Sequence, residues 1–329
     1  PDFLAALDHV RRQPDQESMS VFTPVSESQA SAFLADYDLG DLQSLQGIAE
    51  GIENSNFFLT TGTGRFVLTL FERTPAEDLP YFLGVMAHLA AAGIPCARPI
   101  PDRHGQVLRR LNGRAATLVE CLTGRASETP NAAQCATIGA TLAQMHRAAA
   151  DFDGHRENCR GPRWWRESAS RLAPRLPAAQ ADLLGDEIAE QDRADDSALP
   201  RGVIHADLFR DNALFEGDAL TGLIDFYYAC NDCWLYDLAV CVNDWALIPD
   251  APSAYADSLL SAYAAQRPFT VAERAAWPMK LRAAALRFWV SRLVDWHFPR
   301  DGELTYAKDP TVFEALLRRH RSQPMSLPA

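Results

Sequence analysis

Hydrophobic and polar positions in the first third of the chain predict several short strands and two helices. The runs NFFLTT and RFVLTLF are separated by GTG, a pattern typical of a β-hairpin. LQGIAEG before them is expected to form a third strand. QVLRRL and ATLVECL, separated by Asn112 and Gly113, are expected to form two more. Helices are expected over about residues 24–38 and 76–92.

Helical periodicity dominates the chain from Ala132 onward. The run IGATLAQMHRAAADF places Ile138, Leu142 and Met145 on one face, as an amphipathic helix would. Residues 203–226 are the one strand-rich segment that we expect in this half. Further helices are expected over residues 163–195, 236–265 and 277–297.

This order of elements predicts an α+β protein with two lobes. Residues 19–120 are expected to form a small lobe around an antiparallel sheet, and residues 121–329 a larger, mainly helical lobe. Met19 begins a segment that resembles a natural start. Residues 1–18 are therefore interpreted as an upstream extension without a functional role.

Composition narrows the class of protein. A chain of 329 residues with 47% hydrophobic content can bury a sizeable core. The net charge of −12 argues against a nucleic acid partner. No run reaches the ~18–20 apolar residues that a membrane helix needs, so no membrane partner is expected.

The seven cysteines are scattered, which is typical of a reducing compartment and predicts a cytoplasmic protein. Cys230 and Cys233 form a C-x-x-C pair, but a zinc site would require a second pair. Buried thiols are the preferred interpretation.

The stretch VIHADLFRDNALF places polar residues between apolar flanks that could fill a core. The next strands, ALF and LTGLI, should form a hairpin that returns Asp225 to the neighbourhood of Asn212, with Asp207 on the loop leading in. Two carboxylates and a carboxamide would then converge. Such oxygen ligands suit Mg²⁺, and one carboxylate could take a proton from an acceptor hydroxyl. Turn or capping roles are the alternative for each residue alone, but the spacing favours a site.

HADLFRDN resembles the protein-kinase catalytic loop, and IDF stands where kinases carry D-F-G. The whole pattern resembles the aminoglycoside phosphotransferase-type family of small-molecule kinases. That resemblance implies a two-lobed, protein-kinase-like fold that uses ATP and Mg²⁺. It also implies that Asp207 is the catalytic base, that Asn212 and Asp225 are metal ligands, and that His205 and Asp237 are structural.

Two departures exclude a protein kinase. Ala206 replaces the arginine of the kinase loop, and only eleven residues separate Asp225 from Asp237. That interval is too short for an activation segment.

The resemblance also implies that the first lobe binds the nucleotide. Asn54 and Ser55, in GIENSN, are expected to donate to phosphate oxygens, and an ordinary polar turn is the alternative interpretation. LVECLTG resembles the kinase hinge, where main-chain groups of Glu120 and Leu122 would pair with adenine. Thr69 occupies the position of the usual lysine. Arg73 and Arg98 are the candidate substitutes, and the sequence does not choose between them.

A wider set of motifs resembles the bacterial homoserine kinases within this family. They include FDGHREN-x-RG, GLIDFYYACND, LR-x-AALRFW-x-SRL and a late KDP. The resemblance implies phosphorylation of L-homoserine to O-phospho-L-homoserine, a step of threonine biosynthesis. A zwitterionic acceptor requires two receptors. Arg287 or Arg292 is the candidate for its carboxylate and Asp232 or Asp244 for its ammonium group. Tyr227 and Trp245 are the candidates for the walls of the site.

Two alternatives stay open from the sequence. A choline- or ethanolamine-type kinase would use the aromatic residues for cation–π contacts, but would leave the arginines of residues 282–292 without an anionic group. A nucleotide-binding pseudokinase would normally have lost one of the three site residues. The oligomeric state is not predicted.

Overall fold

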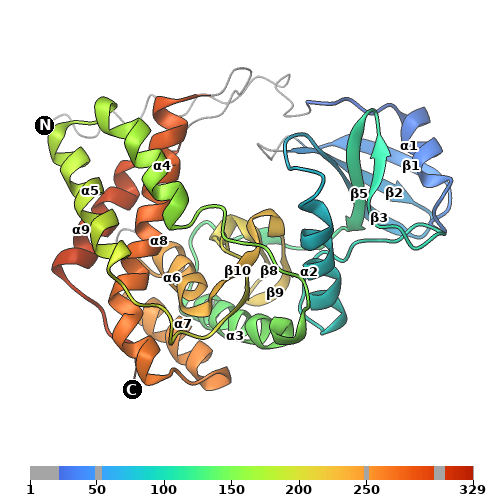
Figure 1. Ribbon diagram of the computed structural model, residues 1–329. Helices are drawn as coiled ribbons and strands as arrows, with labels where there is room; N and C mark the ends of the chain where they lie inside the picture. Colours follow the sequence, from blue (N-terminus) through green and yellow to red (C-terminus); the bar gives the residue numbers. More distant parts are fainter. Residues whose placement is uncertain (1–21, 49–53, 248–251, 300–307, 329) are drawn as a thin grey trace, which may run out of the picture. The chain divides into compact units, whose positions relative to one another are not determined.

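The computed structural model describes residues 22–48, 54–247, 252–299 and 308–328 (Figure 1). The predicted upstream extension, residues 1–18, lies outside them. Contacts between residues divide the chain into two compact units. The first comprises Pro1–Glu77 and Pro99–Cys121, and the second Asp78–Arg98 and Leu122–Ala329.

The first unit contains a five-stranded antiparallel sheet with the order β1-β2-β3-β5-β4. The predicted hairpin is confirmed as β2 and β3, and the third strand, β1, starts earlier than expected. At the tight turn between β4 and β5, Asn112 and Gly113 both have positive φ, 49° and 80°. The strands are β1 (Leu42–Gly47), β2 (Asn54–Thr61), β3 (Gly64–Phe71), β4 (Arg109–Leu111) and β5 (Arg114–Glu120).

One face of this sheet packs against helix α1 (Glu27–Leu34). A capping box formed by Ser26 and Gln29 starts the helix. The helix is shorter than predicted because the chain turns after Leu34, and Tyr37 packs into the core instead. The core includes Phe33, Phe57, Leu59, Phe66, Leu68, Leu70 and Leu118.

Helix α2 (Leu79–Ala91) forms where the sequence predicts it, but its contacts place it in the second unit. Tyr81 donates a hydrogen bond to Asn231 Oδ1 (2.9 Å), and Arg156 pairs with Asp78 (3.0 Å). The predicted lobe boundary at residue 120 did not anticipate that residues 78–98 group with the second unit. The boundary itself stays a prediction.

Helices form most of the second unit (Figure 1). Segment 163–195 contains two helices, and so does segment 236–265. Helices α3 and α7 approach closely at Gly139, where an added Cβ would lie 2.1 Å from the carbonyl oxygen of Leu259. The helices are α3 (Ala132–Ala148), α4 (Pro162–Leu172), α5 (Ala178–Asp192), α6 (Trp234–Trp245), α7 (Ser253–Gln266), α8 (Val271–His297) and α9 (Thr311–Ser322).

Two small sheets complete this unit. Strand β7 (Arg201–Ile204) pairs with β10 (Cys230–Cys233), and β6 (Arg125–Ala126) pairs with the hairpin of β8 (Ala213–Glu216) and β9 (Ala219–Leu223). The predicted hairpin is therefore confirmed. Among the described residues, no helix combines the length and hydropathy needed to cross a membrane.

Candidate functional site

The loop that follows β7 is held in place by His205. Its Nε2 lies 3.0 Å from the carbonyl oxygen of Ile224, and its Nδ1 accepts a hydrogen bond from the Asp207 backbone N–H (3.3 Å). Burial lowers the pKa of His205, so the ring is neutral near pH 7 and can serve as donor and acceptor at once. His205 thus links the loop to the residue before Asp225.

Asp237, in the first turn of α6, accepts hydrogen bonds from the backbone of the same loop. Its Oδ1 accepts from the Ala206 backbone N–H (2.7 Å), and its Oδ2 accepts from the His205 backbone N–H (2.9 Å) and lies 3.0 Å from His146 Nε2. Ala206 has φ of 65°, a conformation that costs a residue with a Cβ about 1–2 kcal/mol. These hydrogen bonds offset that strain, which is the structural role expected of Asp237.

Burial of Asp237 by itself would raise its pKa. The hydrogen bond from His146 and the charge interactions with His146 and His205 outweigh that effect, so the pKa of Asp237 lies below its usual value. The carboxylate therefore stays ionised at neutral pH.

The structure brings Asp207, Asn212 and Asp225 together. The Asn212 amide donates to the main-chain oxygen of Asp207 (2.8 Å) and lies 3.4 Å from its carboxylate. The Ile224 N–H donates to the Asn212 carbonyl (3.0 Å), so the hairpin delivers Asp225 next to Asn212. Asp225 is exposed and has φ of 62°. Within the described residues, Oδ1 of Asn212 accepts no hydrogen bond.

The Asp207 carboxylate has an unusual environment. Burial raises its pKa to about 7, and Asp225 and Asp211 add to the rise, while Arg287 and Lys308 oppose it. Arg287 Nη2 lies 3.7 Å from Asp207 Oδ1, and the Arg287 side chain is 6% exposed. A carboxylate with a pKa near 7 is suited to accept a proton at neutral pH.

Arg287 reaches this loop from α8 and packs against Phe288 and Tyr228, with its Cζ 3.7 and 5.2 Å from the two ring centroids. Tyr227, the predicted wall residue, packs edge-on against Phe82 of α2 at 6.0 Å. Tyr228 is the tyrosine beside Arg287. Sequence reasoning missed it, because two adjacent tyrosines give no signal for which one faces the loop.

The other predicted acceptor residues have partners within the fold. Asp232 accepts from Asn158 (2.8 Å) and Arg201 (2.7 Å), and it lies at the end of the β7–β10 pair away from the loop. Arg292 donates to the Asp309 carbonyl (2.8 Å). Asp244 pairs with Arg210 (3.1 Å). The structure thus places Arg287, and none of these three, in contact with Asp207.

The predicted nucleotide contacts of the first unit also differ from one another. Ser55 is fully buried, and its hydroxyl accepts from the Phe22 and Thr23 N–H groups and donates to Glu72. Asn54 is 7% exposed, and its Oδ1 has no hydrogen-bond partner among the described residues. The geometry favours Asn54 over Ser55 as a polar ligand.

Glu120 is the last residue of β5, the strand that the predicted hinge continues. Leu122, in the second unit, packs against Gly222: an added Cβ there would lie 2.4 Å from Leu122 Cδ1. Their predicted main-chain contacts with adenine stay predictions.

Thr69, which stands in place of the kinase lysine, is buried and donates a hydrogen bond to Asn56 Oδ1 (2.8 Å) on the adjacent strand. Both side chains lie on the sheet face opposite the core formed by Leu68 and Leu70. A neutral pair therefore occupies the site of the missing cation.

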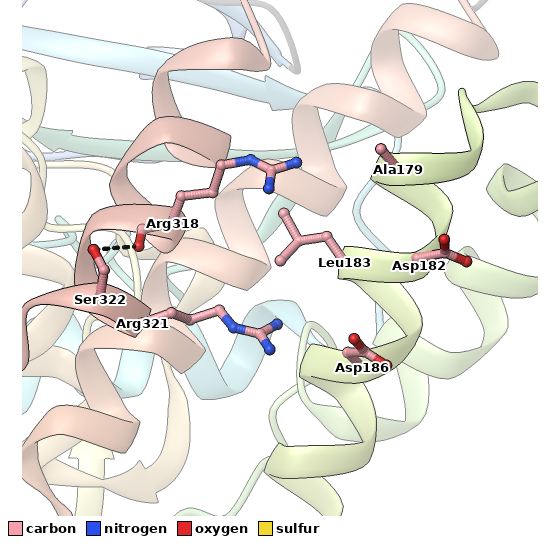
Figure 2. A pocket seen from close by; sticks show the side chains of 7 residues that line it. All are labelled: Ala179, Asp182, Leu183, Asp186, Arg318, Arg321 and Ser322. Carbon is pink, nitrogen blue, oxygen red and sulfur yellow. Dashed lines mark hydrogen bonds between the residues drawn. The ribbon is translucent and has the colours of Figure 1, made fainter.

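Other polar groups lie apart from this loop. Cys230 and Cys233 are buried free thiols whose pKa values burial raises, as the sequence interpretation expected. The open groove in Figure 2 lies between α5 and α9, and its lining includes Asp182 and Asp186 of α5 and Arg318 and Arg321 of α9. None of its lining residues belongs to the loop or hairpin just described.

Known proteins resemble this chain in sequence and in fold. The family model described as "Phosphotransferase enzyme family" matches residues 44–302. The chain belongs to the phosphotransferase enzyme family. Within it, the chain is 51% identical to homoserine kinase of Methylobacillus flagellatus over 91% of its own length and 95% of that protein. It is 48% identical to homoserine kinase of Neisseria meningitidis, over 91% of this chain and 99% of that one.

A solved amicoumacin kinase in complex with AMP-PNP and Ca²⁺ has a TM-score of 0.67 to this phosphotransferase. The match has 16% identity and covers 91% of this chain and 93% of the other. Likeness at this identity concerns the fold, and it confirms the predicted kinase-like architecture. The family membership and the homoserine kinases among its relatives confirm the prediction of a kinase enzyme.

Proposed function

We propose that this phosphotransferase transfers the γ-phosphoryl group of ATP to the side-chain hydroxyl of L-homoserine, giving O-phospho-L-homoserine and ADP. Relatives that share about half of its residues over nearly their whole length carry the name homoserine kinase. The structural observation that carries the proposal is the buried Arg287 beside Asp207 (3.7 Å), because it puts a carboxylate receptor next to the proposed base.

Asp207 would orient the acceptor hydroxyl and take its proton. As that proton moves to the carboxylate, the hydroxyl oxygen bonds to the γ-phosphorus and the bond to the β-phosphate oxygen breaks, leaving ADP. The raised pKa of Asp207 makes it a stronger base than an exposed aspartate, and Arg287 keeps part of the site positively charged.

Asn212 and Asp225 fit a Mg²⁺ ion. Asn212 presents an oxygen that accepts no hydrogen bond among the described residues. Asp225 presents an exposed carboxylate, and the residue before it, Ile224, donates its N–H to the Asn212 carbonyl. The described residues contain no group of three His, Cys, Asp or Glu that could hold a metal alone, and Mg²⁺ usually takes only one or two protein carboxylates. When bound, the ion would neutralise charge on the transferring phosphates.

We propose that Asn54 and the main chain of Glu120 and Leu122 contribute to nucleotide binding. The buried carboxamide of Asn54 is a candidate for a polar contact with the nucleotide. Ser55 would support the same strand through the hydrogen bonds that occupy its hydroxyl.

The function is tested by a panel of acceptors with Mg²⁺-ATP, in which ADP release is measured for homoserine, choline, ethanolamine and an aminoglycoside. We expect kcat/KM for homoserine to exceed each of the others by on the order of a hundredfold or more, because the other acceptors bring no carboxylate to the buried Arg287. A higher kcat/KM for choline or ethanolamine would favour that class of kinase. Phosphorus NMR of the product identifies the phosphorylated oxygen.

A further inference from the structure

The ammonium group of the proposed acceptor requires an anionic partner close to Asp207. The two residues that the sequence suggested for this role bind arginines of the fold instead: Asp232 pairs with Arg201 (2.7 Å) and Asp244 with Arg210 (3.1 Å). Asp232 also lies at the end of the β7–β10 pair away from the loop. Another carboxylate of the loop region is therefore the better candidate.

Asp211 belongs to the same loop as Asp207. The Phe209 N–H donates to the Asp207 carbonyl (2.8 Å), and the Asn212 N–H donates to the Phe209 carbonyl (3.0 Å). These hydrogen bonds close the loop into a tight turn over Arg210–Asn212, which keeps Asp211 near Asp207. The charge of Asp211 accordingly contributes to the raised pKa of the Asp207 carboxyl. The Asp211 side chain is 59% exposed, so a small molecule has access to it.

Asp211 already binds an alkylammonium group of the protein. Lys308 Nζ lies 3.1 Å from Asp211 Oδ2, and the Lys308 side chain is 58% exposed. The adjacent Asp309 is held in place, because its carbonyl accepts from Arg292 (2.8 Å) and its carboxylate accepts from the Thr311 N–H (2.8 Å). An exposed ion pair of this kind is weak, so a substrate ammonium group can compete for the carboxylate.

Aromatic packing joins the loop to the two helices that carry these cations. The ring of Phe209, in the loop, lies 4.3 Å from that of Phe288 on α8 and 6.0 Å from that of Phe313 on α9. The rings of Phe288 and Phe313 are themselves stacked at 5.2 Å. Arg287 precedes Phe288 on α8, and Lys308 lies just before α9. The packing therefore brings both cations to one loop.

We propose that Asp211 binds the ammonium group of the acceptor in exchange for Lys308, so that the enzyme selects an amino acid over a hydroxy acid. The inference rests on the proposed function. The ammonium and carboxylate groups of an α-amino acid share one carbon, which in homoserine is two methylene groups from the hydroxyl carbon's oxygen. With the hydroxyl at Asp207 and the carboxylate at Arg287, the ammonium group lies beside the same loop. Asp211 would accept a charge-assisted hydrogen bond from it, as it does from Lys308.

The test compares two acceptors that share a hydroxyl and a carboxylate. L-Homoserine has the ammonium group, and 4-hydroxybutyrate lacks it. We expect Asp211→Asn to raise the KM for homoserine about tenfold or more, while the KM for ATP and kcat/KM for 4-hydroxybutyrate change less than about twofold. Asp218→Asn is the matched control, because Asp218 contacts Asn131 and lies at the tip of the neighbouring hairpin.

Lys308→Met separates a binding role of Asp211 from a structural role of the ion pair. If Asp211 and Lys308 served only to hold the loop, removing either partner should impair the use of both acceptors to a similar extent. If Asp211 binds the substrate, Lys308→Met removes a competing ammonium group. The KM for homoserine should then stay within about twofold of the wild-type value or fall below it, opposite to the effect of Asp211→Asn.

A further readout does not depend on turnover. Calorimetry with L-2-aminobutyrate, which has the carboxylate and ammonium group but no hydroxyl, should show about tenfold weaker binding to Asp211→Asn. Butyrate, which lacks the ammonium group as well, should bind the variant and the wild type with affinities within about twofold of each other. Circular dichroism and the Tm of each variant establish that it is folded.

The inference is overturned if Asp211→Asn leaves the KM for homoserine and aminobutyrate binding unchanged, if it impairs both acceptors equally, or if Lys308→Met reproduces its effect. A wild-type protein that does not phosphorylate homoserine would instead refute the proposed function, and this inference with it. The two failures are therefore distinguishable.

Discussion

The predicted site residues of the two units, taken unit by unit, differ in whether the fold already uses their hydrogen-bonding groups. Asp237 and Ser55 spend theirs on backbone N–H groups, which makes them supports. Asn212 and Asn54 each keep a side-chain oxygen that accepts no hydrogen bond among the described residues. Buried polar groups normally have partners, so the buried Oδ1 of Asn54, which has none among the described residues, is a candidate for a ligand contact.

At the scale of single residues, Asp207→Ala removes the group that would take the acceptor proton. We expect kcat to fall by about a thousandfold, with little change in the binding of Mg²⁺-ADP. ADP release and calorimetry measure the two quantities. Asp218→Asn, at the tip of the same hairpin, is the control, because Asp218 contacts Asn131 and not the loop. Near-normal turnover of Asp207→Ala would exclude it as the base.

Asp225→Asn tests the metal site. Replacing the exposed carboxylate with a neutral amide should raise the Mg²⁺ concentration for half-maximal turnover about tenfold or more, since one anionic ligand is lost. Turnover is measured as a function of Mg²⁺ at saturating ATP. An unchanged Mg²⁺ dependence would place the metal on other residues.

At the scale of elements, α6 determines the conformation of the loop that follows β7. The buried Asp237 near its N-terminus accepts from two consecutive backbone N–H groups, which holds Ala206 at positive φ. His146 of α3 and Tyr263 of α7 extend the contact (3.0 and 2.9 Å). Three helices thus support one loop, so its geometry depends on their packing.

Asp237→Asn should lower the free energy of unfolding by about 3 kcal/mol, because an amide cannot accept all of these hydrogen bonds and leaves buried donors unsatisfied. Urea unfolding measures the change. Asp192→Asn is the control: Asp192 forms an exposed pair with Arg166, and its loss should cost at most about 1 kcal/mol.

The same substitution has a predictable pH dependence. The pKa of Asp237 is lower in the folded state than in the unfolded chain, so its contribution is present above about pH 4 and is lost as the pH falls through the folded-state value. The Tm difference between wild type and Asp237→Asn should therefore be constant from pH 7 to about 5 and shrink in stronger acid. A difference that grows on acidification would contradict this assignment.

At the scale of the molecule, the second unit is discontinuous in sequence. Helix α2 precedes the last two strands of the first unit, yet Tyr81 and Phe82 contact Asn231 and Tyr227 of the second. In sequence, α2 lies between β3 and β4 of the first unit, whereas its contacts place it in the second unit.

We therefore expect a fragment of residues 122–329 to unfold at a lower temperature than the second unit does in the whole chain. Adding a peptide of residues 78–98 should raise the Tm of that fragment, because the peptide restores the surface that α2 covers. A scrambled peptide is the control. A fragment whose Tm does not respond to the peptide would support the boundary at residue 120 instead.

Local features of the fold and of the site could be predicted from the sequence. The hairpin between Asn212 and Asp225 follows from turn residues between two short apolar runs, and the Asn112-Gly113 turn follows from the preference of those residues for positive φ. Both depend on interactions between neighbours in the chain, which a linear pattern records.

By itself, the sequence determined the two-lobed architecture, the phosphotransferase motif and the convergence of Asp207, Asn212 and Asp225, because these depend on short-range patterns. Only the tertiary structure decided that Arg287 lies beside Asp207 and that Tyr228 packs against Arg287. It also decided that Asp232 accepts a hydrogen bond from Asn158 within the fold. Such choices depend on how helices far apart in sequence pack together. An arginine on a helix has the same local signal whether its partner is a substrate or another part of the fold.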